Sequence, residues 1–310
     1  MIAGMDVGPL TGFLAASLRV ATPLLLAGIG ETITERSGII NLGLEGAMLA
    51  GALASAIGAS AYGPWAGVAS AMAAGALVAA GFAACVVFVR VNQIVAGTAV
   101  TLVCVGLTGT IYRRAYGAAG VGLSLPTLTP ISVPGLGNLP VVGPVLTQPA
   151  LTYVAVGLVP LVWWGLYRTR WGLGLRASGE AGPLARAAGV RVRSLRFWAT
   201  VFGGAMGGLA GATLVLAQVG TFAEKMTAGR GYIAIAIVVL GRWHPGGVAL
   251  AALLFGAVTA LQFLFQSLRL SVPYQFFLML PYLLTLLALA GVVGRVRAPA
   301  ALAAEERDGV

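Results

Sequence analysis

Residues 45–90 of the chain read EGAMLAGALASAIGASAYGPWAGVASAMAAGALVAAGFAACVVFVR, and no charged residue lies between Glu45 and Arg90. A transmembrane helix needs about 20 consecutive, mostly apolar residues, so this run is long enough for two. Tyr62-Gly63-Pro64 interrupts the run, and glycine followed by proline favours a turn. The stretch therefore predicts two membrane-spanning helices joined by a tight turn.

The composition of the whole chain also indicates a membrane protein. Of its 310 residues, 59% are hydrophobic and only 9% are charged, whereas about 25% are charged in a typical soluble domain. A water-soluble surface of this size needs far more charge. Soluble enzymes, nucleic-acid-binding proteins and disordered chains are thereby excluded, and we expect an all-α polytopic membrane protein.

Further apolar runs predict the remaining helices. They lie at 10–30, 93–112, 150–167, 197–219, 246–268 and 273–293. A shorter run at 231–241 predicts either a short helix or a partly re-entrant one. Residues 115–149 contain six prolines and are expected to form a long loop. The total is about nine transmembrane helices, in a range of about eight to ten. Ala21-Thr22 and Ala212-Thr213 begin a short internal similarity at an offset of 191 residues, as expected for two pseudo-repeats.

The arginines predict how the chain is oriented. Segment 168–196 carries seven arginines and a single acid, Glu180, and arginine-rich loops face the cytoplasm. We therefore expect one transmembrane domain, 1–297, with 168–196 and a short tail, 298–310, in the cytoplasm, and with the N-terminus and loop 115–149 outside. The same arrangement places Arg113 and Arg114 outside, against the rule. Because topology accounts for the positive charge, no nucleic-acid partner is expected.

Several kinds of chemistry are missing from the sequence. There is no GxxxxGK[ST] motif, and Lys225 is the only lysine, so we expect no ATP-binding site in this chain. His244 is the only histidine and is expected to be an interfacial residue rather than a metal ligand. Cys85 and Cys104 both lie within apolar runs. We therefore expect no catalytic residue and no metal site.

The segment 30–46, GETITERSGIINLGLEG, concentrates polar residues between two apolar runs. Acidic residues at membrane depth are costly and mark polar pathways or pairs between helices. The candidate residues of a substrate pathway are Glu31, Asn41, Glu45 and Gly46. The alternative is a simple polar turn in which Glu35 and Arg36 are solvated.

Small residues recur at every fourth position in two places, a pattern that lets helices pack closely in lipid. The glycines expected to serve this packing are Gly43, Gly51, Gly203, Gly207 and Gly211.

Four blocks of sequence together resemble the permease subunits of bacterial ABC importers for nucleosides and simple sugars. They are GETITERSGIINLGLEGAMLAGA (30–52), RTRWGLGLRASGEAGPLARAAGV (168–190), FGGAMGGLAGA (202–212) and MTAGRGYIAIAIVVLGRWHPGG (226–247). The first block is more similar to the nucleoside branch than to the ribose branch.

The resemblance implies an ABC-importer permease fold in the inner membrane of a bacterial cell. It implies that cytoplasmic ABC ATPases bind ATP and Mg, so that no cofactor is expected in this chain. It also implies an extracytoplasmic substrate-binding protein or lipoprotein and a second permease, either a longer paralogue or a copy of this chain. Nucleosides are the expected substrates, with ribose-like sugars or riboflavin-like compounds as alternatives. A stand-alone secondary transporter or channel and a non-transporting membrane scaffold are the competing hypotheses.

The ATPase-coupling segment of the family corresponds to Gly179, Glu180, Ala185, Ala187 and Gly189. Ala181 and Gly182 depart from the pattern, since relatives commonly carry Asn and Pro there.

Overall fold

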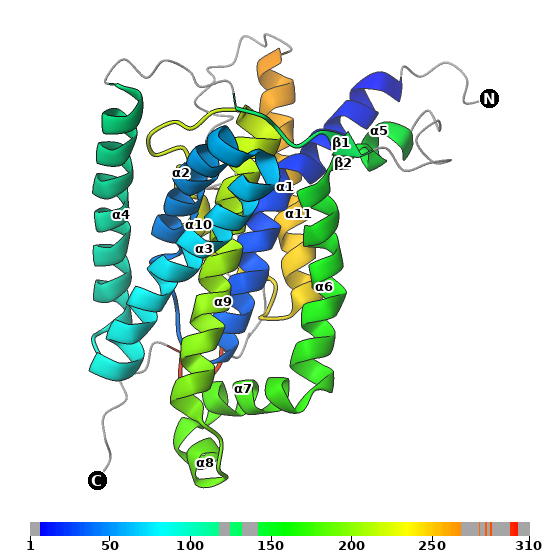
Figure 1. Ribbon diagram of the computed structural model, residues 1–310. Coiled ribbons are helices and arrows are strands. Elements are labelled where there is room, and N and C mark those ends of the chain that lie inside the picture. The colour runs from blue at the N-terminus through cyan, green and yellow to red at the C-terminus, as the bar shows by residue number, and fades with distance from the viewer. Residues whose placement is uncertain are drawn as a thin grey trace, which may run out of the picture.

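The computed structural model describes residues 7–117, 125–131, 142–267, 279, 283, 286 and 298–302. In this part of the chain, seven helices are long and apolar enough to cross a membrane. They are α1 (Val7–Arg36), α2 (Leu44–Tyr62), α3 (Pro64–Ala83) with its π-helical extension η1 (Ala84–Val89), α4 (Gln93–Tyr116), α6 (Ala150–Arg168), α9 (Val192–Thr213) with its π-helical extension η2 (Leu214–Val219), and α11 (Pro245–Ser267) (Figure 1).

The remaining elements are short. They are α5 (Val142–Leu146), α7 (Arg170–Glu180), α8 (Gly182–Ala187), α10 (Arg230–Leu240), and the strands β1 (Pro130–Ile131) and β2 (Gln148–Pro149), which pair antiparallel. The expected loop 115–149 thus contains α5 and both strands in its described part. The expected loop 168–196 is largely helical, because α7, α8 and the start of α9 fall within it.

The break between α2 and α3 follows the sequence expectation. Gly63 has a φ of +92°, a backbone conformation that glycine adopts easily, and Pro64 occupies the first turn of α3. The first helix differs from the expectation of 10–30, because α1 continues to Arg36. The short run 231–241 forms the 11-residue helix α10. The run 273–293 lies outside the described residues except for three isolated positions, so the seven long helices and α10 are what the structure describes of the expected nine.

The two ends of the bundle are formed by different elements. Figure 1 shows α7 lying across the ends of α6 and α9, with α8 beyond it, while the β1–β2 pair lies at the opposite end. We call the end that carries α7 and α8 the α7 end. The described tail residues lie at this end, because the backbone N–H of Ala301 donates to the carbonyl of Gly179 at 2.8 Å. At the opposite end Arg113 forms an ion pair with Glu224 at 3.5 Å. The negative charge of Glu224 thus compensates the positive charge of Arg113, one of the two arginines that the expected topology places outside.

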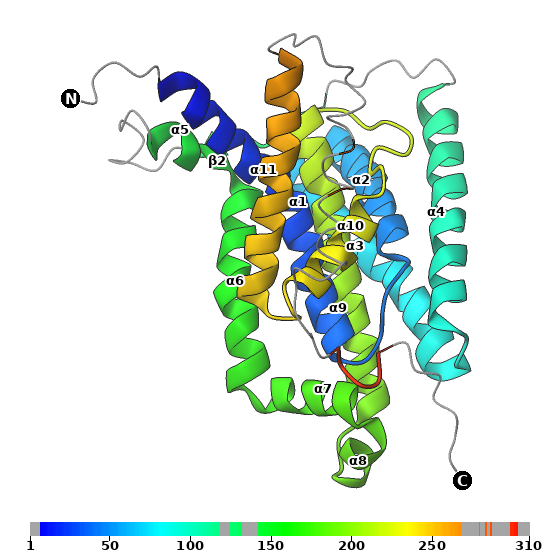
Figure 2. The same ribbon diagram turned by 180° about the vertical axis from the view of Figure 1, so that it is seen from behind.

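α1 and α9 form the centre of the bundle and run antiparallel to each other (Figures 1 and 2). Gly30 of α1 lies against Gly203 of α9. Each of these two helices also packs against two others. α1 packs against α10 and α11, and in an equivalent manner α9 packs against α2 and α3. The helices α1–α2–α3 and α9–α10–α11 are therefore related as an inverted repeat, an arrangement typical of transporters.

The contacts revise the offset of the repeat. A Cβ at Gly256 of α11 would meet the carbonyl of Ser17 and the residue Ala21 on α1, and one at Gly75 of α3 would meet the carbonyl of Gly204 and the residue Gly208 on α9. Packing thus makes Gly208 the counterpart of Ala21, whereas an offset of 191 residues pairs Ala21 with Ala212.

Glycines bring α9 into backbone contact with its neighbours. A Cβ at Gly208 would overlap the carbonyl oxygen of Ala71 on α3, and a Cβ at Gly51 of α2 would overlap Gly208 itself. Of the glycines expected from the small-residue stripes, Gly211 lies against the backbone of Met48 and Gly207 lies against Leu44. Gly208, which lies outside the expected stripes, makes backbone contacts as close as those of Gly211.

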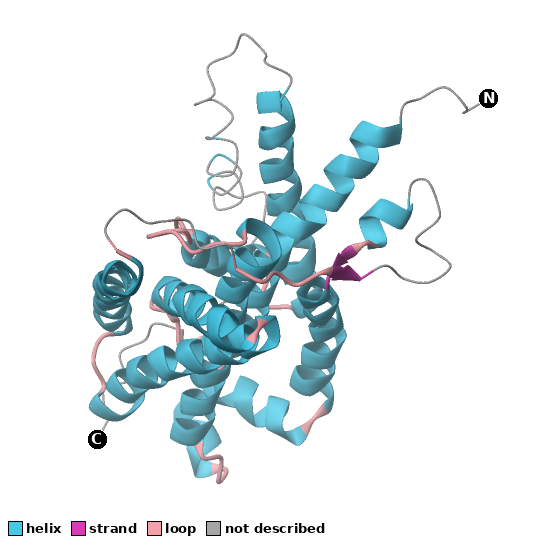
Figure 3. Ribbon diagram, turned by 45° about the horizontal axis from the view of Figure 1, so that its top comes forward, coloured by secondary structure: helices cyan, strands magenta, loops and turns pink. Residues whose placement is uncertain are grey.

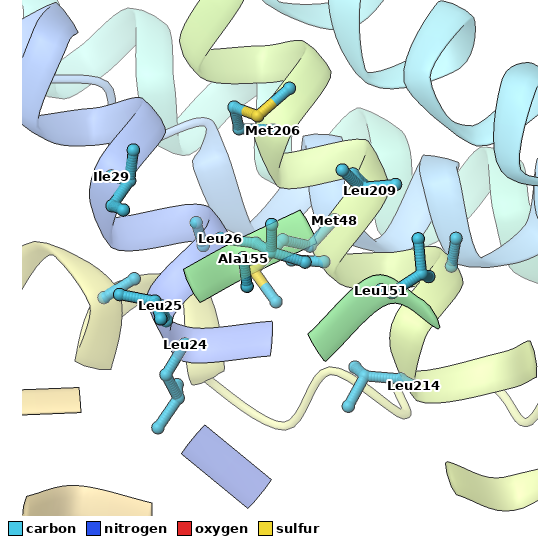
Figure 4. Packing of buried hydrophobic residues seen from close by; sticks show 14 of the residues in the cluster. Leu24, Leu25, Leu26, Ile29, Met48, Leu151, Ala155, Met206, Leu209 and Leu214 are labelled. Atoms are coloured by element: carbon cyan, nitrogen blue, oxygen red, sulfur yellow. The ribbon is translucent and has the colours of Figure 1, made fainter. Parts of the chain in front are cut away.

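Large apolar side chains fill the space between these helices and α6. Leu26 and Ile29 of α1, Met48 of α2 and Leu151 of α6 are all essentially inaccessible. Figure 4 shows them in one continuous cluster with Leu209 of α9. The view in Figure 3 shows α4 standing beside the rest of the bundle.

We predict that Gly208→Ala destabilises the protein by about 1–3 kcal/mol, because the new methyl group is forced against backbone atoms. Thermal unfolding in detergent, followed by size-exclusion fluorescence, measures the effect. The control is Gly157→Ala on α6, where a Cβ meets nothing within 4 Å. The control should leave the midpoint unchanged or raise it, and equal midpoints for both variants would contradict the close packing.

Candidate functional site

The last turns of α1 carry a row of fully buried polar residues. Glu31, Thr32, Thr34 and Glu35 all have 0% of their surface exposed. The alternative of a solvated polar turn is therefore wrong for Glu35, and the segment 30–46 is not one loop. Only residues 37–43 are non-helical between α1 and α2.

Glu31 shapes this non-helical stretch. Its Oε1 accepts a hydrogen bond from the backbone N–H of Asn41 at 2.8 Å, which folds the chain back along α1. Gly38 supports the reversal with a φ of +96°. Glu31 Oε2 and both polar side-chain atoms of Asn41 are buried and have no hydrogen-bond partner among the described residues. Buried polar atoms without partners are costly, so these atoms are available to a polar solute or to water.

Glu45 lies in the first turn of α2 and binds the start of α10. Its Oε1 accepts from Thr227 Oγ1 at 2.6 Å and from the N–H of Gly229 at 2.9 Å, and its Oε2 accepts from the N–H of Gly231 at 2.7 Å. The first N–H groups of a helix have no partner within the helix, and a negative charge there is favourable. Glu45 thus caps α10 from a different part of the chain.

The other end of α10 is attached to the end of α1. Trp243 Nε1 donates to Glu35 Oε2, and Arg36 Nε donates to the carbonyl of Trp243 at 2.9 Å. Residues 35–45 therefore hold both ends of α10, which lies against both α1 and α2 (Figure 2).

Unusual backbone conformations flank α10 on both sides. Lys225 and Ala228 before it, and Arg242 and Trp243 after it, have φ values between +47° and +58°. Such conformations are uncommon for residues other than glycine and gather at functional sites. A short helix with irregular flanks in a membrane is typical of transporter binding sites.

Gly46 and Gly43 lie beside α4. A Cβ at Gly46 would meet Thr101 and Cys104 of α4, and one at Gly43 would meet both Val100 of α4 and Oδ1 of Asn41. Both glycines therefore lie where α4 approaches α2, whereas Glu31, Asn41 and Glu45 lie in or beside the polar cluster.

The residues expected to form the coupling segment lie at the α7 end. Glu180, Ala187 and Gly189 are exposed, while Gly179 and Ala185 are buried. Gly189 has a φ of +84° and ends the turn after α8. Three exposed positions on one projecting turn are available to a soluble partner.

The segment is connected directly to the polar cluster. The Ser37 carbonyl accepts from Ser178 Oγ at 3.2 Å and from Arg196 Nε at 3.1 Å. Arg196 also donates to the Ser178 carbonyl at 3.0 Å, and a Cβ at Gly179 would overlap the Arg36 carbonyl. The end of α7 thus contacts the residue at which α1 ends.

Sequence reasoning missed Ser37, Thr227, Trp243 and Arg196. Each acts through a partner far along the chain, and the sequence carries no local signal for such pairs. His244, expected to be interfacial, is exposed and stacks on Tyr167 with ring centroids 5.5 Å apart. No group of three or more metal-ligating side chains occurs in the part of the chain that the structure describes.

An inverted helical repeat, a short helix held by buried carboxylates and a basic segment at one end are typical of a membrane permease. The chain belongs to the family described as branched-chain amino acid transport system / permease component, whose sequence model matches residues 13–289. It is thus a multi-pass permease component of an ABC transporter in the cell membrane. Such a component works with an ATPase and a substrate-binding protein, and the ATPase activity does not reside in the permease.

Named relatives cover nearly the whole chain. The guanosine ABC transporter permease protein NupQ of Bacillus subtilis is 36% identical over 299 residues, which are 92% of this chain and 93% of NupQ. The nucleoside ABC transporter permease protein NupC of Lactococcus lactis is 33% identical over 306 residues, or 95% of this chain and 96% of NupC. The putative glucose ABC transporter permease protein TsgC13 of Haloferax volcanii is 39% identical over 266 residues, or 84% and 79%. No solved structure matches the chain.

We predict that Glu45→Gln loosens the start of α10. Glutamine replaces one of the two acceptor oxygens with an NH2 donor. At least one of the N–H groups of Gly229 and Gly231 therefore loses its partner, at a cost of about 1–3 kcal/mol. Hydrogen exchange of residues 224–232, measured by mass spectrometry, should accelerate about tenfold or more.

The matched control is Glu224→Gln, because this carboxylate is 38% exposed and forms only a surface ion pair. It should leave exchange in α10 nearly unchanged. Wild-type exchange rates in Glu45→Gln would show that Glu45 does not hold α10.

Proposed function

We propose that this chain is the permease through which an ABC importer moves nucleosides across the membrane. The observation that carries the proposal is the near full-length similarity to two relatives named for guanosine and for nucleosides. The relative named for glucose supports simple sugars as the second candidate. ATP and Mg belong to the ATPase partner in this proposal, and delivery of the solute belongs to an extracytoplasmic binding protein or lipoprotein.

Glu31 and Asn41 are the proposed polar contacts of the pathway. Their unpartnered, buried atoms provide both donors and acceptors, and hydroxyl-rich solutes such as nucleosides and sugars need both. Glu45 acts by holding α10 beside them. Both oxygens of its carboxylate already accept hydrogen bonds, from three donors in total.

The α7 end faces the cytoplasm in this proposal, with the C-terminus on the same side and the N-terminus outside. The arginines of segment 168–196 support this orientation through the positive-inside rule. The exposed positions Glu180, Ala187 and Gly189 then contact the ATPase, and Gly179 and Ala185 anchor the turn that presents them.

A second permease completes the pathway, as a longer paralogue or as a second copy of this chain. α4 supports a partner at its side of the bundle, because Leu102, Val103 and Leu107 are more than half exposed there. Exposed apolar side chains on a spanning helix are suited either to lipid or to another helix.

Transport is tested with the complex of this chain and its ATPase, binding protein and second permease in proteoliposomes. Labelled guanosine should accumulate on the side of the membrane at which the ATPase is supplied with ATP. An ATPase variant that cannot hydrolyse ATP should abolish uptake. Uptake of glucose but not guanosine would replace the nucleoside assignment with the sugar assignment. Uptake by this chain alone, driven by an ion gradient, would overturn the ABC mechanism for it.

We predict that Gly189→Val uncouples the ATPase. A β-branched residue at a φ of +84° costs about 1–3 kcal/mol and reshapes the exposed turn. Solute-stimulated ATP hydrolysis, measured on the purified and assembled complex, should fall at least tenfold. Glu180→Lys should act in the same direction by reversing an exposed charge.

Gly117→Val is the matched control for Gly189→Val. Gly117 has a φ of +81° and, like Gly189, open space around its Cβ position, but it ends α4 at the opposite end of the bundle. Equal losses of stimulation in both variants would attribute the effect to strain in the chain rather than to ATPase contact.

A further inference from the structure

An apolar groove of about 490 Å³ opens between α6 and α9, with α1 behind it and α7 at one end. Leu161 and Gly165 of α6, Ala205 of α9 and Ile33 of α1 line its walls. Figure 1 shows α6 and α9 separated above α7, which bridges their ends. The volume is within the range of roughly 300–1,000 Å³ that ligand sites occupy.

The lining excludes a polar solute. Every residue that lines the groove is apolar or aromatic except Gly165, and a polar ligand needs side chains that accept or donate hydrogen bonds. The transported solute is therefore not its occupant. A hydrocarbon chain, in contrast, requires only apolar contact.

Two tryptophans define the depth of the groove in the membrane. Trp171 at the start of α7 and Trp198 of α9 both line it, and they are 44% and 62% exposed. Tryptophan gathers at the level of the lipid headgroups. The groove thus starts at the membrane surface of the α7 end and extends into the hydrocarbon region.

Exposed arginines flank the same corner. Arg168 ends α6 and Arg170 begins α7, directly before Trp171. Neither forms an ion pair with a carboxylate of the described residues. The Arg168 guanidinium lies 5.9 Å from the ring centre of Trp163. Basic residues at the edge of a pocket between transmembrane helices bind anionic lipid headgroups.

We propose that this groove binds an anionic glycerophospholipid. One acyl chain lies between α6 and α9, and the phosphate group is held at Arg168 and Arg170. The positive charge at the mouth and the apolar walls complement the two parts of such a lipid. Because the lipid touches α6, α7 and α9 at once, it braces α7 against the bundle.

The test uses the transporter complex purified from membranes and transferred to nanodiscs that contain phosphatidylcholine and phosphatidylglycerol with identical acyl chains. Native mass spectrometry after release into detergent measures the retained lipid. We expect phosphatidylglycerol to be enriched at least fivefold over phosphatidylcholine on the wild-type protein. Added phosphatidylglycerol should also raise the thermal midpoint, because a ligand stabilises the state that it binds.

Two variants remove the two halves of the site. Ala205→Phe fills the groove, and the double variant Arg168→Gln/Arg170→Gln removes the charge at its mouth without touching the core. Each should abolish the enrichment. The controls are Leu77→Phe on the exposed face of α3 and Arg114→Gln at the opposite end, and both should keep it.

Enrichment that persists in the double arginine variant would overturn the headgroup assignment, even if Ala205→Phe failed to fold. Equal retention of the two lipids by the wild-type protein would overturn the proposal altogether. Loss of the second permease from the Ala205→Phe complex, with lipid retention unchanged, would show that the groove is a contact between permeases instead.

Discussion

The carboxylate of Glu45 allows a helix to begin inside the membrane part of the protein. Lipid tails offer no partner to free backbone N–H groups, so an interrupted helix requires partners from the protein itself. Glu45 supplies both of its oxygens to the start of α10 and to Thr227. The start of the short helix and the irregular backbone before it depend on this cap.

A continuous path of contacts joins this cap to the α7 end. Ser178 and Arg196 hold the carbonyl of Ser37, where α1 ends. The preceding residues Glu35 and Arg36 hold Trp243 at the far end of α10. A few hydrogen bonds thus connect α7 with the far end of α10.

The sequence predicted the elements better than their partners. The charge-free run 45–90 and the Gly63-Pro64 pair give α2, α3 and the turn between them because these signals are local. The polar segment 30–46 stands out in the sequence, but no local signal predicts that Glu31 to Arg36 are helical, since burial by other helices favours helix there. The pairs Glu45–Thr227 and Glu35–Trp243 span 182 and 208 residues, and only the folded chain brings them together.

The backbone contacts at Gly75, Gly204 and Gly208 have a mechanical consequence. Where two helices touch without side chains between them, neither can slide or roll by a residue without driving a Cβ into the backbone of the other. α2, α3 and α9 therefore behave as one stiff frame. We therefore expect movements of this permease to take place around that frame, at elements such as α10 whose attachments are hydrogen bonds that can exchange.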